Sequence, residues 1–456
     1  MKKKLTAILM GITVGALCLT GCSPKEDAKK DSENKEASSS TDSKESSDNG
    51  EEIKMTFSHL YVPGESFNDV IVPAIENFNK DYDGKYEITI DEMPQEAYLT
   101  QTNARGTADD LAEIVMVNGS MMKGFSDTGV IIPITDIVKE TGIDTVLNPG
   151  IIEEGTNIDD GEVYSIPIMS GTYGFILYNT EVFKEVGIET FPKTLAEFET
   201  VCEKIKGAGY VPMGLGLKDL WAGDSLLFSS FVNNFVGNEW YESIRKKDGS
   251  ASYNDPEFIE ALKAYQGLAQ KGYFNSDFTS ISNDERLSLY LNKKVAMVSA
   301  GDWECGNIMD SDAEVGEKTK AAAWPVPENT KVDGSIVKSG AWGMAFGSKI
   351  TDAQLEGAKI FMKDYFFTEE SGEILFKNSN EVGSWKFEMD SSLLSTPAAS
   401  MYEVVEANEP CVNWDATQEP SVKQVIQRGL QDLLMENISA EELAQAIQEE
   451  YELCAQ

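Results

Sequence analysis

The chain has 456 residues, of which 41% are hydrophobic and 9% aromatic, so it can bury a large core and is long enough for two or three globular units. Its 38 Lys and Arg stand against 77 Asp and Glu, and this formal net charge of −39 has the wrong sign for a protein that neutralises phosphates, so we expect no nucleic-acid partner. The single histidine, His59, cannot supply a multi-histidine zinc site, and we predict no metal and no cofactor.

The N-terminus has the pattern of a lipoprotein signal peptide. Lysines at positions 2–4 precede the apolar segment 5–17, which is too short to cross a bilayer comfortably. The following Leu19-Thr20-Gly21-Cys22 resembles the bacterial lipobox, whose cysteine carries the lipid; an uncleaved anchor followed by an incidental cysteine is the alternative. We therefore predict a signal peptide over residues 1–22 and a lipid on Cys22 that holds the protein at the outer face of the cell membrane.

Residues 23–52 consist of Ser, Lys, Glu and Asp with almost nothing apolar. Burial cannot offset the entropy of ordering such a segment. We predict a disordered tether here, and a Ser-rich tether behind a lipobox indicates a Gram-positive surface.

Strands and helices alternate from residue 53 onward. Predicted strands at 53–59, 86–90 and 112–117 are separated by predicted helices at 70–78 and 96–105. Such alternation indicates an α/β layer with a mainly parallel sheet.

A second α/β series begins near residue 173. A strand at 175–178 precedes a helix at 180–186, and Thr194-Leu195-Ala196-Glu197 is a capping box that predicts a helix ending at Gly207. The remaining predictions are a helix from Asp255-Pro256, a buried strand at 295–299, a strand around 345–346, a helix at 352–367 and a C-terminal helix after Ser439.

Most motifs that carry chemistry are incomplete. Gly214-Leu215-Gly216 begins like a dinucleotide fingerprint but lacks the third glycine, and residues 79–84 imitate half of a calcium loop without its bidentate glutamate. Carboxylates are too abundant to identify a glycosidase pair. Cys202, Cys305, Cys411 and Cys454 show no CxxC spacing, and they are either buried thiols or disulfide partners.

Tryptophans beside Gly and Asp in predicted loops are more informative. A sugar stacks its C–H face on a flat ring while its hydroxyls need donors and acceptors. Core packing is the alternative for each ring. We predict ligand contacts at Trp303 and Trp414, with Trp221, Asp224 and Trp385 behind them, whereas Trp342 lies inside a predicted strand and is predicted to be structural.

Several stretches resemble the extracellular solute-binding lipoproteins of carbohydrate ABC importers, of the maltose-binding-protein-like type. They are segments 161–167 and 177–183, the helix start Pro192-Lys193-Thr194-Leu195-Ala196-Glu197-Phe198, and Lys294-Val295-Ala296-Met297-Val298 with Gly301-Asp302-Trp303. Their order and spacing together carry the resemblance, which covers residues 51–456.

The resemblance implies a two-lobed α/β fold, each lobe a mainly parallel sheet flanked by helices, with a ligand cleft between the lobes. The implied crossings near Met169, Ala323 and Asn380 give a first lobe of residues 53–168 and 323–379 and a second lobe of residues 169–322 and 380–456. We expect the lobes to close on the ligand by bending at these crossings.

The resemblance also implies site residues. Trp303 matches the sugar-stacking tryptophan, and Asp302 stands beside it. The other implied or neighbouring contacts are Ser58, His59 and Tyr61 after the first strand, Asn118, Gly119 and Ser120 after the third, and Thr172 in Ser170-Gly171-Thr172, where many relatives have a carboxylate. That last departure leaves the identity of the sugar open.

The implied function is capture of a mono- or oligosaccharide by a monomeric protein that hands it to an ABC transporter permease, without covalent chemistry. One alternative is a non-sugar solute such as a polyamine, a peptide or a phosphorylated compound, which a site dominated by Arg or by carboxylates would indicate. A surface glycosidase is the other alternative.

Overall fold

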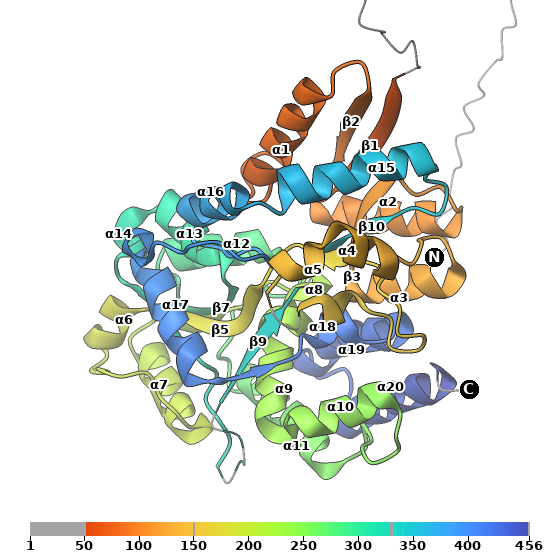
Figure 1. Cartoon of the computed structure of the whole chain (residues 1–456). Helices are drawn as coiled ribbons and strands as arrows, with labels where there is room; N and C mark the ends of the chain where they lie inside the picture. The colour runs from red at the N-terminus through yellow and green to blue at the C-terminus, as the bar shows by residue number, and fades with distance from the viewer. Residues whose placement is uncertain are drawn as a thin grey trace, which may run out of the picture. The chain divides into compact units, whose positions relative to one another are not determined.

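The computed structural model of the protein describes residues 52–148, 151–328, 330, 332, 334–340 and 342–454 (Figure 1). The predicted signal peptide, Cys22 and the tether up to residue 51 lie outside these residues. Within the described ranges, no helix is long and apolar enough to cross a membrane. The predicted two-lobed α/β fold is confirmed.

The first lobe is built on a five-stranded sheet with the order β2-β1-β3-β10-β4. β1 runs parallel to β2 and β3, whereas β10 is antiparallel to both of its neighbours. Its elements are β1 (Ile53–His59), α1 (Asn68–Asp81), β2 (Tyr86–Glu92), α2 (Gln95–Thr107), β3 (Ile114–Asn118), α3 (Gly119–Thr128), α4 (Thr135–Thr141), α5 (Ile143–Val146), η1 (Ile151–Gly155), β4 (Ile166–Pro167), β10 (Trp342–Phe346), α15 (Asp352–Phe361), η3 (Met362–Phe366) and α16 (Glu369–Ser379).

The second lobe is built on a six-stranded sheet with the order β11-β9-β5-β7-β6, and β8 also pairs with β5. Its elements are β5 (Gly171–Asn179), α6 (Thr180–Glu185), α7 (Leu195–Gly207), β6 (Val211–Gly214), α8 (Leu220–Gly223), η2 (Asp224–Phe228), α9 (Ser229–Val236), α10 (Asn238–Lys246), α11 (Pro256–Gln270), α12 (Asn283–Leu291), β7 (Val295–Gly301), α13 (Trp303–Ser311), α14 (Ala313–Gly316), β8 (Thr319–Ala322), β9 (Ser335–Ser339), η4 (Ser391–Leu393), α17 (Thr396–Ala407), β11 (Glu409–Cys411), α18 (Trp414–Thr417), α19 (Pro420–Leu434) and α20 (Ala440–Cys454).

The expectation of a mainly parallel sheet is wrong for the second lobe. β5 runs antiparallel to β7, β8 and β9, and only the pairs β6–β7 and β9–β11 are parallel. β5 follows the crossing into the second lobe and β9 precedes the crossing out of it, which accounts for the antiparallel pairing of these two strands.

The crossing near Met169 is observed between β4 and β5, but the other two expected boundaries need correction. Gly171 of β5 pairs with Ser339 of β9, so the chain remains in the second lobe until after Ser339 and does not leave it at Ala323. After α16, Trp385 still forms a bridge to Leu147 of the first lobe, so the third crossing follows this residue and does not begin at Asn380.

Local signals in the sequence fix several element boundaries. The predicted capping box at the start of α7 is present, because the Thr194 side chain accepts from the Glu197 amide and the Glu197 carboxylate accepts from the Thr194 amide. Ser439 and Glu442 make the same reciprocal contacts before α20. These bonds satisfy backbone donors that would otherwise lack partners at a helix start.

Candidate functional site

Segments of both lobes meet at the crossing that contains Met169. Tyr61 follows β1 of the first lobe, and Tyr173 lies in β5 of the second lobe. Both hydroxyls donate to the Met169 sulfur at 3.5 Å. The structure therefore brings the predicted contact Tyr61 to the entry of the second lobe.

Three rings from the second lobe form an aromatic cluster, which we define as Tyr173, Trp221 and Trp303. The centroid of the Trp303 ring lies 5.3 Å from that of Tyr173 and 6.2 Å from that of Trp221. Both tryptophans are only partly buried. A Cβ on Gly301 would lie 2.1 Å from the Trp303 ring, so the glycine that ends β7 allows this ring to fold back over the strand.

Asp302 holds the end of β7 against the start of β5. Its carboxylate accepts from the amides of Thr172 at 2.8 Å and Trp303 at 3.1 Å, and its own amide donates to the Thr172 carbonyl at 3.0 Å. Burial raises the pKa of Asp302. Asp302 and Thr172 therefore set the position from which Trp303 projects.

A second buried carboxylate, Glu381, lies close to this group in the segment after α16. It is 3% exposed, and its Oε1 atom has no hydrogen-bond partner. Burial is the main cause of the raised pKa of Glu381, and the negative charges of Asp302 and Glu65 add to it, while hydrogen bonds with the side chains of Ser66 and Ser379 act in the opposite direction. Folding therefore favours the protonated form of Glu381.

This linkage predicts the pH dependence of stability. A glutamate whose pKa is raised in the folded protein adds to the free energy of unfolding, and this contribution is fully present below the ordinary pKa of 4.5. It is lost as the pH rises through the raised pKa of the folded state. We expect Glu381→Gln to be more stable than the parent protein at neutral and alkaline pH and nearly equal to it in acid. One linked proton changes stability by at most about 1.4 kcal/mol per pH unit.

Urea unfolding at several pH values measures this difference. The matched control is Glu388→Gln, which changes an exposed carboxyl in the same segment. If Glu381→Gln and Glu388→Gln have parallel pH profiles, Glu381 is not the linked group.

Two predicted ligand-contact tryptophans lie in the cores, and for both the prediction of a ligand-facing ring is wrong. Trp414 is 0% exposed and stacks on Tyr241 with centroids 4.3 Å apart. Trp385 is 1% exposed and donates from Nε1 to the Thr368 carbonyl at 2.7 Å. Asn413 caps the short helix α18 over a core, and the buried Ser384 hydroxyl donates to the Pro167 carbonyl.

Other predicted contacts serve structure within one lobe. The Ser58 hydroxyl donates to Asp91 at 3.1 Å, and Asn118 caps α3 by accepting from the Met121 amide at 2.9 Å. His59 is 0% exposed, and burial lowers its pKa to about 4. Asp224 is also 0% exposed, and burial followed by repulsion from Asp415 raises its pKa.

Ser120 and Gly119 join the two lobes. The Ser120 hydroxyl lies 3.1 Å from the carbonyls of both Asp415 and Gln418 in the second lobe. A Cβ on Gly119 would lie 1.7 Å from the Ala416 carbonyl oxygen. α3 therefore touches α18 through a residue that has no room for a side chain.

We expect Gly119→Ala to separate the lobes, because the carbonyl that it would strike belongs to the backbone of a packed helix. Small-angle X-ray scattering should give a larger radius of gyration, while the free energy of unfolding changes by less than about 1 kcal/mol, because alanine is a good helix residue. Gly124→Ala on the same helix is the control, since its Cβ would meet Pro420 at an ordinary 3.8 Å. Equal radii for the two variants would contradict the expectation.

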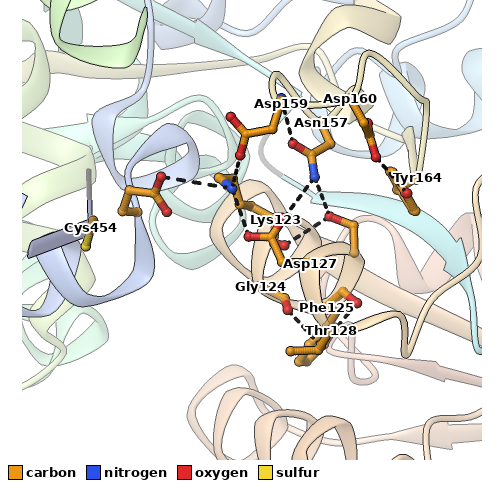
Figure 2. A network of polar contacts seen from close by, with 12 residues as sticks. Lys123, Gly124, Phe125, Asp127, Thr128, Asn157, Asp159, Asp160, Tyr164 and Cys454 are labelled. Carbon is orange, nitrogen blue, oxygen red and sulfur yellow. Dashed lines mark hydrogen bonds and ion pairs between the residues drawn. The ribbon is translucent and has the colours of Figure 1, made fainter. Parts of the chain in front are cut away.

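A cavity of about 430 Å³ lies farther along the lobe boundary. It is lined by α3, the segment 153–158, α10 and the segment 412–422. Figure 2 shows Lys123 at this boundary, 2.8 Å from Asp127 and 2.6 Å from Asp159 in the first lobe. Glu419 of the second lobe is 4.0 Å from Lys123 and 3.0 Å from Lys247, so this carboxylate pairs with two lysines.

Sequence reasoning missed Tyr173, Glu65 and Glu381 as members of the site. Tyr173 adjoins the Ser170-Gly171-Thr172 segment that the sequence does single out. Glu65 lies in the same loop as Tyr61 and accepts from the Val62 amide at 3.0 Å. Glu381 lies far along the chain in a segment without a motif, and the folded arrangement brings it near Tyr61.

Neither metal nor disulfide chemistry is evident in the part of the chain that the structure describes. It contains no group of three or more His, Cys, Asp or Glu arranged to hold a metal ion. Cys202, Cys305, Cys411 and Cys454 are free thiols, and the first three are buried. The question of pairing that the sequence leaves open is thus answered in favour of unpaired thiols.

Comparison with known families gives one match that covers most of the chain. The model for bacterial extracellular solute-binding proteins matches residues 62–372. An uncharacterised ABC transporter extracellular-binding protein of Pyrococcus horikoshii is 29% identical over 41% of this chain and 41% of its own length. A probable sugar-binding periplasmic protein of Mesorhizobium japonicum is 22% identical over 55% of this chain and 57% of its own length. The chain thus spans about half the length of these relatives.

Solved structures match over nearly the whole described part. A chitin oligosaccharide binding protein has a TM-score of 0.80 at 23% identity, covering 88% of this chain and 99% of its own. A solute-binding protein in complex with raffinose has a TM-score of 0.67 at 17% identity, covering 87% of this chain and 98% of its own. At these identities the similarity concerns the fold.

Proposed function

Because the chain belongs to the bacterial extracellular solute-binding proteins, we propose that it captures a mono- or oligosaccharide outside the cell and delivers it to the permease of an ABC transporter. The observation that carries this proposal is the aromatic cluster, which stands beside buried hydrogen-bonding groups where the two lobes meet. The sugar ligands named for the chitin oligosaccharide and raffinose proteins of the same fold support it.

In this proposal Trp303 and Trp221 stack on the sugar, and Tyr61 offers its hydroxyl from the other lobe. Asp302 and Thr172 position Trp303, and Ser120 holds the lobes together when the ligand is enclosed. Periplasmic binding proteins as a class close around ligands by hinge bending. Bending at the crossing that contains Met169 would open the path to the rings.

The protein acts without covalent chemistry in this proposal and works as a monomer. Its test is a thermal-shift screen against neutral, amino and acidic sugars, because a ligand that binds only the native state raises the melting temperature. A sugar that raises the melting temperature and is recovered unchanged supports binding. Recovery of a hydrolysed product would support a glycosidase instead.

We propose further that Cys22 carries a lipid that anchors the protein on the outside of the membrane. We expect Cys22→Ala to yield an uncleaved precursor without diacylglycerol, because the thiol is the acceptor of the lipid. Intact-mass measurement of the membrane fraction checks this, with Cys454→Ala as the matched cysteine control. A lipidated Cys22→Ala protein would contradict the anchor.

A further inference from the structure

The two tryptophans of the aromatic cluster belong to elements that are far apart in the sequence, α8 for Trp221 and α13 for Trp303. Their ring centroids lie 6.2 Å apart, and their planes are inclined by 52°. Both rings pack against one small group of buried side chains, which consists of Tyr173, Ala222, Leu226, Val337 and Cys411. Apolar packing has no direction, so it does not fix the angle between two rings. Directional bonds to α8 and α13 are needed to hold this angle.

The start of α12 holds α8 in place. Asp219 occupies the N-cap position of α8, but its side chain does not cap that helix. Its carboxylate accepts instead from the amide of Asn283, the first residue of α12, at 2.8 Å. Ser282 caps α12 by accepting from the amide of Glu285, so Asp219 supplies an acceptor for an amide that the capping box leaves open. Trp221 follows Asp219 by two residues and is thus tied to α12.

The glycines of Gly214-Leu215-Gly216, which only begin like a dinucleotide fingerprint, bring the same two segments together. A Cβ on Gly216 would lie 2.2 Å from the Ser282 carbonyl oxygen, so only glycine allows this approach. The next two amides along the chain donate to carbonyls of the segment 278–281 at 2.6 and 3.1 Å. The segment that leads to Trp221 therefore runs beside the segment that leads to α12.

The same turn of α12 also holds α13. Glu304 follows Trp303 directly and is 1% exposed. Its Oε1 atom accepts from the side-chain amide of Asn283 at 3.4 Å and pairs with the Arg286 guanidinium. The Arg286 Nε atom in turn donates to the Asn283 carbonyl at 3.3 Å. Asn283 therefore bonds to α8 through its backbone amide and to α13 through its side chain.

We propose that the first turn of α12 sets the angle between Trp221 and Trp303, with Asp219 and Asn283 as positioning residues. Neither of these two residues touches the sugar, and each acts through a ring. The inference rests on the proposed capture of a sugar, because a ring face that is held ready needs no ordering when the sugar binds. A preformed face therefore binds a sugar more tightly than a face that the sugar must assemble.

Two substitutions of Asp219 separate positioning from direct contact. Asp219→Ala removes the acceptor for the Asn283 amide, whereas Asp219→Asn keeps an acceptor oxygen and loses the charge. The probes are the N-acetylglucosamine tetramer, raffinose and maltose, and the one that raises the melting temperature most is titrated by calorimetry. We expect Asp219→Ala to weaken its binding about tenfold and Asp219→Asn to weaken it less than about threefold. Asp284→Ala removes an exposed carboxylate from the same turn and should bind the sugar as the parent does.

Circular dichroism reports the angle between the rings without any sugar. Two indoles 6.2 Å apart couple their electronic transitions, and the resulting bands depend on the angle between the rings. Trp240 and Trp414 form another close pair, so the contribution of Trp221 is taken as the difference between the spectra of the parent and of Trp221→Phe. We expect Asp219→Ala and Asn283→Ala to lose most of this contribution, and Asp219→Asn and Asp284→Ala to keep it.

The outcomes distinguish the positioning role from sugar capture. An unchanged contribution in both Asp219→Ala and Asn283→Ala would overturn the positioning role. Equal losses of affinity in Asp219→Ala and Asp219→Asn, with unchanged circular dichroism, would mean that the carboxylate contacts the sugar; this overturns positioning and leaves sugar capture standing. Loss of the contribution in Asp219→Ala, with no sugar in the thermal screen raising the melting temperature, would support positioning and count against sugar capture.

Discussion

Trp303→Ala is expected to weaken sugar binding by roughly 2 to 4 kcal/mol, or about 30- to 1,000-fold. The ring is partly exposed and packs beside Tyr173 and Trp221, so the substitution removes a stacking face without emptying a core. Gly301 and Asp302 set its direction, and both remain in the variant. Calorimetric titration measures the loss of affinity.

Trp414→Ala is the matched control because it removes the same side chain from a core. Its ring is 0% exposed and stacks on Tyr241, so we expect a loss of about 3 to 5 kcal/mol in the free energy of unfolding. Trp303→Ala should lose far less stability in the same urea titration. Near-normal affinity with a large loss of stability for Trp303→Ala would mean that Trp303 belongs to the core.

Arg286→Met is expected to destabilise the second lobe by about 3 to 5 kcal/mol, because it leaves a buried charge without its partner. Arg286 and Glu304 have side-chain exposures of 2% and 1% and form an ion pair between α12 and α13. The Arg286 guanidinium also donates to the Ser299 carbonyl. Urea unfolding measures the change.

A double variant distinguishes the cost of a stranded charge from loss of packing. Arg286→Met combined with Glu304→Leu should recover most of the lost stability, since apolar pairs often replace buried ion pairs at little cost. A double variant no more stable than the single one would show that the stranded carboxylate is not the cause. Glu304 follows Trp303 directly. The affinity of the double variant for the sugar therefore also shows whether the Arg286–Glu304 ion pair positions the Trp303 ring.

The sequence predicts those parts of the fold that depend on local bonds. The capping box at Thr194 and the glycine that ends β7 each act within a few residues, and both were predictable. Trp303 was predicted for the same reason, since Gly301 and Asp302 determine where its ring goes. Tyr61 was placed by the resemblance of its loop to a known family.

Features that depend on distant pairing could not be predicted in this way. The boundary after Ser339 depends on its pairing with Gly171, and no local pattern marks a strand that belongs to the other lobe. Trp414 looked like a loop residue because Asn413 precedes it, yet Asn413 caps α18 over a core that includes Tyr241. Glu381 lies in no motif, and its importance comes from its burial near Asp302.

We expect the ligand to bind between the lobes at the aromatic cluster. A crystal structure of the protein with the sugar found by the thermal screen would show where it binds. We predict density for the sugar between the lobes, with its ring face on Trp303 or Trp221 and a polar group within hydrogen-bonding distance of Glu381 or Tyr61. Density for the sugar in the cavity beside Lys123, with the aromatic cluster unoccupied and unchanged, would contradict it.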